Sequence, residues 1–216
     1  VRGRITRLKK DLIRIEKERH TQSMRRDSEY RVALVGYTNA GKSTLFKALT
    51  GTDVYIQDQL FATLDTTIRK LSLDSSHTIL LSDTVGFIRK LPHNLVASFK
   101  STLKEVLEAD LILMVLDISS PQISEHITTI FDVLKEMSAN KIPIVKVLNK
   151  VDLISNGKLI QKLQQSFPDS VTISAKNHLR LSDLKQKIIT MMESNYETVD
   201  LKLTYNDGKT IAQVQE

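Results

Sequence analysis

Gly36-Tyr37-Thr38-Asn39-Ala40-Gly41-Lys42-Ser43 is a complete Walker A phosphate loop, G-x-x-x-x-G-K-S. It comes directly after the apolar run 32–35, which predicts a buried strand, and directly before a helical pattern that begins near Lys42. In such a loop the glycines allow a tight turn, backbone N–H groups converge on the β- and γ-phosphates, the lysine adds a positive charge, and the serine offers a hydroxyl to Mg²⁺. The stretch therefore predicts a strand, a loop and a helix that together hold a nucleoside triphosphate.

The composition of the 216 residues excludes several other classes of function. No run approaches the eighteen or more consecutive apolar residues of a membrane span, and we expect a soluble, cytoplasmic protein and a monomer. Cysteine is absent, which excludes disulfides and cysteine-based zinc sites or catalysis, and the five histidines are scattered without the spacing of metal ligands. The metal to expect is one that arrives with phosphates.

The net charge of +6 lies entirely in the first segment of the chain. Residues 1–31 hold eleven Lys and Arg against five Asp and Glu, whereas the other 185 residues hold twenty of each kind. Such a surplus could attract a polyanion such as RNA through counterion release, or it could form the solvated face of a helix. Charge alone does not choose between the two.

Residues 1–30 predict a basic linker helix that is long and amphipathic. Its apolar residues are Ile5, Leu8, Leu12 and Ile15. Their 3-4-3 spacing places them on one side of a helix, in a narrow stripe that is typical of one strand of a coiled-coil pair. Because the chain starts in mid-pattern at Val1, we expect a fragment of a longer protein whose preceding helix is absent; docking on the body of the domain or on a second copy is the alternative.

From residue 31 to residue 195, strand and helix patterns alternate. Apolar runs that predict strands buried on both faces lie at 32–35, 79–82, 111–116, 144–148 and 171–173. The helical patterns between them lie at about 43–50, 94–109, 123–138, 157–167 and 181–193. Residues 67–73 predict an edge strand in a hairpin with 78–82 across Asp74-Ser75-Ser76. This order predicts an α/β domain with a doubly wound, mostly parallel six-stranded sheet, and residues 196–216 predict the start of an incomplete further domain.

Asp83-Thr84-Val85-Gly86 stands at the carboxyl end of the strand predicted at 79–82. In the doubly wound fold that end lies beside the phosphate loop, where a Walker B aspartate reaches Mg²⁺ through its hydration shell. Gly86 would give a backbone N–H to the γ-phosphate. The D-x-x-G pattern is common by itself, and its separation from the Walker A loop is what favours this role.

Two further motifs follow strands and predict the base. Asn149-Lys150-Val151-Asp152 follows the run at 144–148, and Ser174-Ala175-Lys176 follows the run at 171–173. The Asp152 carboxylate can accept hydrogen bonds from the N1–H and the 2-amino group of guanine, whereas adenine offers no such pair of donors. Lys150 can lie along the base, and the Ala175 N–H can reach guanine O6. The predicted ligands are therefore GTP and GDP.

Three strings narrow the class further: VGYTNAGKSTLF at 35–46, DQLFATLD at 58–65 and DTVGFIRKLP at 83–92. Together they resemble the HflX family of ribosome-associated GTPases. The resemblance covers residues 1–195 and implies a P-loop G domain that hydrolyses GTP, an amino-terminal domain joined through a helical hairpin whose second helix is the linker helix, and a small carboxyl-terminal domain. It also implies binding to the large ribosomal subunit and its rRNA, with splitting or rescue of stalled ribosomes in bacterial members.

By this resemblance Thr63 is the switch I threonine, which coordinates Mg²⁺ and senses the γ-phosphate, with Thr66 or Thr67 as alternatives. The candidate catalytic residues are Lys42, Thr63 and Gly86. The candidate metal ligands are Ser43, Thr63 and, through water, Asp83. The candidate nucleotide-binding residues are Asn39, Ala40, Gly41, Lys42, Ser43, Thr44, Phe61, Ala62, Thr63, Asp83, Gly86, Asn149, Lys150, Asp152, Ser174, Ala175 and Lys176.

Phe87 stands where Ras-like proteins place the glutamine that orients the attacking water, and a phenyl ring can neither donate nor accept a hydrogen bond. We therefore expect slow intrinsic hydrolysis that depends on a partner or an ion. In related GTPases an asparagine at the position of Asn39 helps to bind K⁺, which gives the hypothesis that K⁺ stimulates turnover; bracing of the loop is the alternative.

The sequence leaves two other classes of function open. A nucleotide-gated interaction module with negligible hydrolysis is favoured by Phe87. A ribosome-assembly or RNA-processing GTPase would have the same nucleotide site and the same basic first segment, but it would bind precursor particles.

Overall fold

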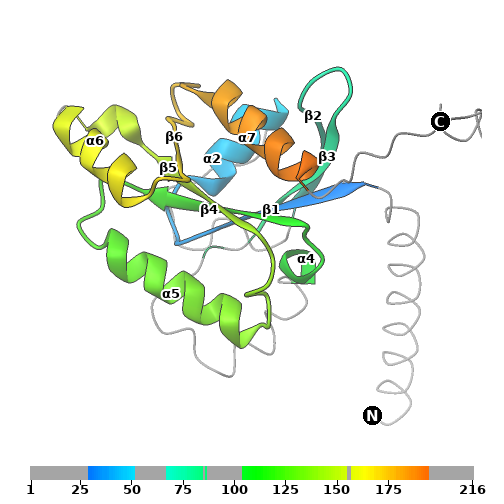
Figure 1. Ribbon diagram of the computed structural model, residues 1–216, viewed down its shortest axis with the longest axis horizontal. Helices are drawn as coiled ribbons and strands as arrows, with labels where there is room; N and C mark the ends of the chain where they lie inside the picture. Colours follow the sequence, from blue (N-terminus) through cyan, green and yellow to red (C-terminus); the bar gives the residue numbers. More distant parts are fainter. Residues whose placement is uncertain (1–28, 52–66, 85, 87–103, 155–156, 195–216) are drawn as a thin grey trace, which may run out of the picture.

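The computed structural model describes residues 29–51, 67–84, 86, 104–154 and 157–194. These residues form a six-stranded sheet with helices on both faces (Figure 1). The strands are β1 (Tyr30–Gly36), β2 (Thr67–Ser72), β3 (Thr78–Asp83), β4 (Leu111–Asp117), β5 (Ile144–Asn149) and β6 (Val171–Thr172). The helices are α2 (Lys42–Thr50), α4 (Lys104–Leu107), α5 (Ile123–Glu136), the 3₁₀ helix η1 (Val151–Leu153), α6 (Gly157–Ser166) and α7 (Leu181–Glu193).

The strand order is β2-β3-β1-β4-β5-β6, and all neighbouring pairs are parallel except β2 with β3. Strand β1 pairs with β3 on one side and with β4 on the other, so the order of the strands reverses around β1. The parallel strands all end at the same edge of the sheet. In open α/β sheets that edge, at the reversal point, is where ligands bind.

The β2–β3 hairpin confirms the edge strand expected at 67–73. Its turn is closed by Asp74, whose Oδ1 accepts hydrogen bonds from the backbone N–H groups of Ser76 (2.8 Å) and His77 (2.7 Å). Asp74 is thus the residue that makes the predicted Asp74-Ser75-Ser76 turn work, because an aspartate side chain can satisfy the N–H groups two and three residues ahead.

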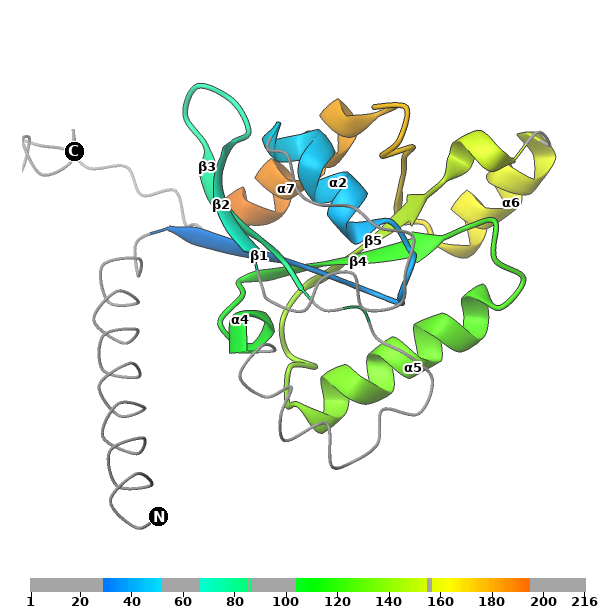
Figure 2. The same ribbon diagram turned by 180° about the vertical axis from the view of Figure 1, so that it is seen from behind.

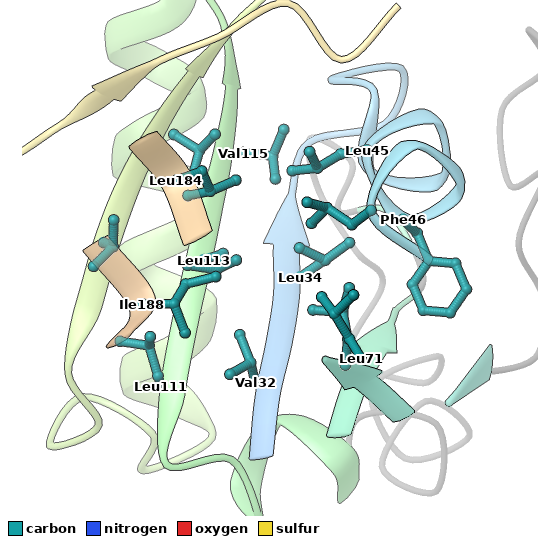
Figure 3. Packing of buried hydrophobic residues seen from close by; sticks show 14 of the residues in the cluster. Val32, Leu34, Leu45, Phe46, Leu71, Leu111, Leu113, Val115, Leu184 and Ile188 are labelled. Carbon is teal, nitrogen blue, oxygen red and sulfur yellow. The ribbon is translucent and has the colours of Figure 1, made fainter. Parts of the chain in front are cut away.

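Both faces of the sheet are buried, which is why the strands are continuous apolar runs rather than alternating ones. Figure 2 shows α2 and α7 on one face and α4 and α5 on the other. Val32 and Leu34 of β1 belong to the cluster under α2 and α7, shown in Figure 3. Their neighbours in sequence, Ala33 and Val35, belong to the cluster under α4 and α5. Period-two alternation along one strand therefore feeds two separate hydrophobic layers.

The element bounds agree closely with those expected from the sequence. The helix expected at 123–138 ends at Glu136, and Ser138 has the left-handed conformation (φ 62°) that terminates it. Of the helix expected at 94–109, only α4 lies within the described residues. The linker helix and the tail at 196–216 lie outside them, apart from residues 29 and 30, so these domain assignments stay predictions. In the ranges that the structure describes, we find no helix with the length and apolar character needed to cross a membrane.

Candidate nucleotide-binding site

The phosphate loop links the end of β1 to the first residue of α2. Gly41 is the N-cap of α2 and has φ 92°, a left-handed conformation that glycine adopts without strain. A Cβ atom at Gly41 would also collide with the side-chain nitrogen of Asn149. Two reasons therefore favour glycine at position 41: the left-handed backbone conformation and the close approach of Asn149, the last residue of β5.

Lys42 is held inside the phosphate loop and is only 6% exposed. Its ammonium group donates hydrogen bonds to the carbonyl oxygens of Gly36 (3.2 Å) and Tyr37 (3.1 Å). Burial lowers the pKa of Lys42 to about 8, an effect that the nearby carboxylate of Asp83 opposes. A buried cation of this kind gains strongly from a phosphate group placed beside it, since the anion offsets its lost hydration.

Ser43 and Asp83 meet next to Lys42, where we expected the metal ligands. The Ser43 hydroxyl donates to Asp83 Oδ2 at 2.6 Å, and the Asp83 side chain is fully buried. Thr84 fixes this end of β3, because its hydroxyl donates to the carbonyl of Leu34 in β1 at 2.6 Å. A hydroxyl and a carboxylate are the hard oxygen donors that suit Mg²⁺. Among the described residues no group of three or more His, Cys, Asp or Glu forms, so phosphate oxygens and water would have to complete the coordination.

Gly86 lies directly against the phosphate loop. A Cβ atom there would be 2.9 Å from Cγ2 of Thr38 and 3.0 Å from the ammonium nitrogen of Lys42. Contacts this short leave no room for a side chain at position 86 unless the loop moves. The D-x-x-G glycine therefore lies beside Lys42, and its hydrogen bond to the γ-phosphate stays a prediction.

Asn149 joins the phosphate loop to the loop after β6. Its Nδ2 donates to the carbonyl of Ala40 at 3.0 Å, and its Oδ1 accepts from the backbone N–H of Ala175 at 3.0 Å. All three residues are buried, so both hydrogen bonds are shielded from water. This bracing role is not evident from the N-K-x-D pattern alone. The hydrogen bond that we expected between the Ala175 N–H and guanine O6 stays a prediction.

Ser174 orients the carboxylate that the sequence assigns to guanine. The buried Ser174 hydroxyl donates to Asp152 Oδ1 at 2.5 Å and accepts from the backbone N–H of Asn177 at 3.2 Å. Asp152 itself is exposed, as a residue that binds a ligand must be. The serine of the Ser174-Ala175-Lys176 motif thus has a specific task, which is to hold Asp152 in one orientation.

Lys150 is positioned by an aspartate that the sequence motifs do not include. Its ammonium lies 2.8 Å from Asp117 Oδ2, and Lys150 has φ 66°. Burial alone would raise the pKa of Asp117, but the hydrogen bonds from Lys150 and Ser119 outweigh it, so the pKa lies below its usual value. Asp117 stays ionised at neutral pH and keeps Lys150 beside the site. The register of β4 with β5 pairs Asp117 with Asn149 and so brings Asp117 next to Lys150, and hydrophobic periodicity does not specify that register.

The remaining candidates lie at the rim or outside the described residues. Asn39, at the tip of the phosphate loop, and Lys176 are exposed, whereas Thr44 in the first turn of α2 is partly buried. Phe61, Ala62 and Thr63 lie outside the described residues, as do Thr66 and Phe87, so their roles stay predictions.

The fold and the site together define a P-loop GTPase domain: a phosphate loop, a carboxylate beside its serine, and an oriented aspartate at the next strand ends. Residues 31–150 match the family described as "50S ribosome-binding GTPase". The chain belongs to this family and, within it, to the HflX GTPases.

Two relatives illustrate the match. The "GTPase HflX" of Caldanaerobacter subterraneus subsp. tengcongensis is 43% identical over 218 residues, covering 100% of this chain and 50% of the relative. That of Escherichia coli K12 is 39% identical over 212 residues, covering 97% and 50%. The chain thus spans about half the length of the curated relatives it matches.

One solved structure illustrates the likeness in fold. It is a GTP-binding protein from the hyperthermophilic archaeon Sulfolobus solfataricus in complex with GDP, with a TM-score of 0.62 and 28% sequence identity. The similarity covers 87% of this chain and 59% of that one.

Asn149→Ala is expected to lower the free energy of unfolding by about 2–4 kcal/mol. The Ala40 carbonyl and the Ala175 N–H would both stay buried but lose their hydrogen bonds to the Asn149 side chain. Urea unfolding measures this. Asn149→Asp keeps the acceptor but places a buried carboxylate oxygen against the Ala40 carbonyl oxygen, so it should lose at least as much stability as Asn149→Ala. The exposed Asn140→Ala is the matched control, expected within about 0.5 kcal/mol of the unaltered protein. Equal stability of Asn149→Ala and Asn140→Ala would contradict the bracing role.

Proposed function

We propose that this domain binds GTP and hydrolyses it to GDP and phosphate as a ribosome-linked switch in the cytoplasm. The main support is the set of hydrogen bonds around Asn149 and Ser174. Asn149 links the phosphate loop to the loop after β6, and Ser174 of that loop orients the Asp152 carboxylate, which suits guanine. When the Asp152 carboxylate and the phosphate loop are held at a fixed distance from each other, the site favours a nucleotide whose base and phosphates match both.

The residues divide the chemistry between them. Lys42 and the phosphate-loop N–H groups would stabilise the negative charge that develops on the transferred phosphoryl group. Ser43 and Asp83 would hold Mg²⁺, which would neutralise further phosphate charge. Gly86, in contact with Lys42 and Thr38, would couple the γ-phosphate to the segment that follows it.

The large ribosomal subunit is the partner that we propose. The description of the matching family supports it, and so does the surplus of positive charge in residues 1–31, since a basic segment binds rRNA by releasing counterions. A stimulating partner also agrees with Phe87, which cannot orient a water molecule by itself.

The test uses the full-length protein with GTP, GDP, ATP and a non-hydrolysable GTP analogue. We expect selective binding of guanine nucleotides, slow GTP turnover that mature large subunits accelerate, and co-sedimentation with those subunits that is stronger with the analogue than with GDP. Preference for precursor particles would instead favour an assembly factor. Single-turnover hydrolysis that stays negligible with ribosomes would favour an interaction module. Equal sedimentation with GDP and the analogue would exclude the switch.

K⁺ is expected to raise GTP turnover about tenfold over Na⁺ at matched ionic strength, if Asn39 helps to place the cation as an added charge. Asn39 is exposed at the tip of the loop and has φ 60°, a conformation that asparagine tolerates better than most residues. Asn39→Gly therefore removes the side chain without straining the backbone, and it should abolish the K⁺ response. Equal rates in the two salts for the unaltered protein would rule this out.

A further inference from the structure

Tyr37 and His126 form an aromatic stack between the phosphate loop and helix α5. Their ring centroids are 4.0 Å apart and the ring planes differ by 12°. Tyr37 is a variable position of the Walker A pattern, and His126 lies in the second turn of α5. Neither side chain belongs to the nucleotide motifs, so the stack calls for a separate explanation.

The backbone of Tyr37 is part of the phosphate-binding machinery even though its ring is not. Its carbonyl oxygen accepts hydrogen bonds from the Lys42 ammonium (3.1 Å) and from the backbone N–H of Ala40 (3.2 Å). Ring and carbonyl belong to one residue, so a ring that is held by stacking restricts how the carbonyl can turn. A displaced carbonyl would remove one of the two backbone hydrogen bonds that hold Lys42, the other being to Gly36, together with the hydrogen bond that closes the loop turn.

Helix α5, which carries His126, is anchored by packing against the sheet. Ile130 and Leu134, on the inner side of α5, are completely buried against the sheet, and Ile123 and Ile127 pack on the same cluster. Figures 1 and 2 both show α5 on the face of the sheet opposite α2. The phosphate loop is thus held from two sides, by α2 through the chain itself and by α5 through His126.

We propose that His126 is a positioning residue for Lys42, acting through the ring and the carbonyl of Tyr37. The proposal rests on the proposed GTPase function and deepens it, because it makes the position of α5 one of the determinants of phosphate binding. A partner that moved α5 would change the hold of Lys42 on the γ-phosphate.

The experiment is a double-mutant cycle in the full-length protein with His126→Ala, Tyr37→Leu and the pair together. Each single variant is expected to lower kcat/KM for GTP about threefold to tenfold, which is the range for losing an aromatic pair. Because the two rings act as one unit, the double variant should lose no more than the worse single variant. Losses that multiply would overturn the proposal.

Two further variants separate positioning from a general structural effect. His126→Phe keeps a planar ring and should restore at least half of the lost activity. Phe131→Ala removes an exposed aromatic side chain of the same helix and should change nothing. Failure of His126→Phe to restore activity would contradict the proposal.

Measurements on the unaltered protein distinguish failure of the proposed role of His126 from failure of the proposed GTPase function. If it binds no guanine nucleotide, the proposed function fails and this inference fails with it. If it turns over GTP normally and the variant losses multiply, only the role of His126 fails. Urea unfolding of each variant, with a free energy of unfolding expected within about 1 kcal/mol of that of the unaltered protein, shows that the kinetic losses arise in folded protein.

Discussion

Lys42→Ala is expected to lower kcat/KM for GTP by about 10²–10³-fold, the usual cost of removing one preorganised group that stabilises charge in the transition state. Lys42 is the buried cation of the phosphate loop, and its ammonium already points at the turn formed by Gly36 and Tyr37. Steady-state phosphate release and nucleotide titration measure the loss. We expect the affinity for GTP to fall more than the affinity for GDP, because Lys42 would interact most strongly with the charge of the γ-phosphate, which GDP lacks.

The matched control is Lys162→Ala, which removes an exposed lysine of α6 and should leave kcat/KM unchanged. Loss of fold is not the expected cause of the Lys42 effect, since the buried ammonium group lowers stability at neutral pH. The unfolding midpoint of Lys42→Ala without nucleotide should therefore be no lower than that of the unaltered protein. A Lys42→Ala variant that turned over GTP at the normal rate would contradict the assigned role.

The pKa of Lys42 also predicts how nucleotide affinity depends on pH. The pKa is about 8 in the folded chain, against 10.5 for an ordinary lysine side chain, and a bound triphosphate raises it again by its negative charge. Binding therefore takes up a proton above pH 8, and the affinity for GTP should weaken by up to about tenfold for each pH unit above 8. Lys42→Ala should lack this slope, and any slope common to both proteins belongs to other groups.

The stability of the protein without nucleotide should change with pH in the opposite direction: it rises above pH 8, whereas the affinity for GTP falls. Below about pH 8 the folded protein carries the buried charge, at a cost of about 3 kcal/mol for the lowered pKa. As the pH rises from 8 towards 10.5 the unfolded chain binds more protons at Lys42 than the folded one, so this cost is progressively relieved. Lys42 thus lowers stability at neutral pH in return for phosphate binding.

Local sequence patterns were sufficient to predict most of the fold. The apolar runs predicted five buried strands because β1 and its neighbours are covered on both faces, and the Asp74 turn predicted the edge hairpin. The positions of Lys42, Ser43 and Asp83 also followed, since a strand end next to a glycine-rich loop has few ways to arrange itself.

Contacts between distant segments could not be predicted in the same way. Asn149 reaches Ala40 across 109 residues, and that hydrogen bond exists only because β5 lies two strands away from β1 in the finished sheet. The Asp117–Lys150 ion pair likewise depends on the register of β4 with β5. Such bonds follow from the order of the strands, which periodicity does not specify.

Asp152→Asn is expected to reverse the choice of base. Asp152 accepts at both oxygens, which matches the N1–H and the 2-amino group of guanine, whereas the asparagine amide places a donor opposite the amino group. Two donors facing each other leave buried hydrogen bonds unmade, so GTP and GDP affinity should fall by about 10²–10⁴-fold. Xanthine carries a carbonyl in place of that amino group, and xanthosine triphosphate should therefore bind the variant better than GTP does.

Ser174 makes this test more specific. Its hydroxyl holds Asp152 Oδ1 at 2.5 Å, so Ser174→Ala should weaken guanine binding about tenfold by releasing the carboxylate, without creating affinity for xanthine. Asp152→Ala should lose both bases. Nucleotide titrations of the three variants with guanosine and xanthosine phosphates give the full comparison. If Asp152→Asn kept its affinity for GDP, the base would be recognised elsewhere, and the oriented carboxylate at the end of β5 would be a structural feature of the loop instead of the group that selects guanine.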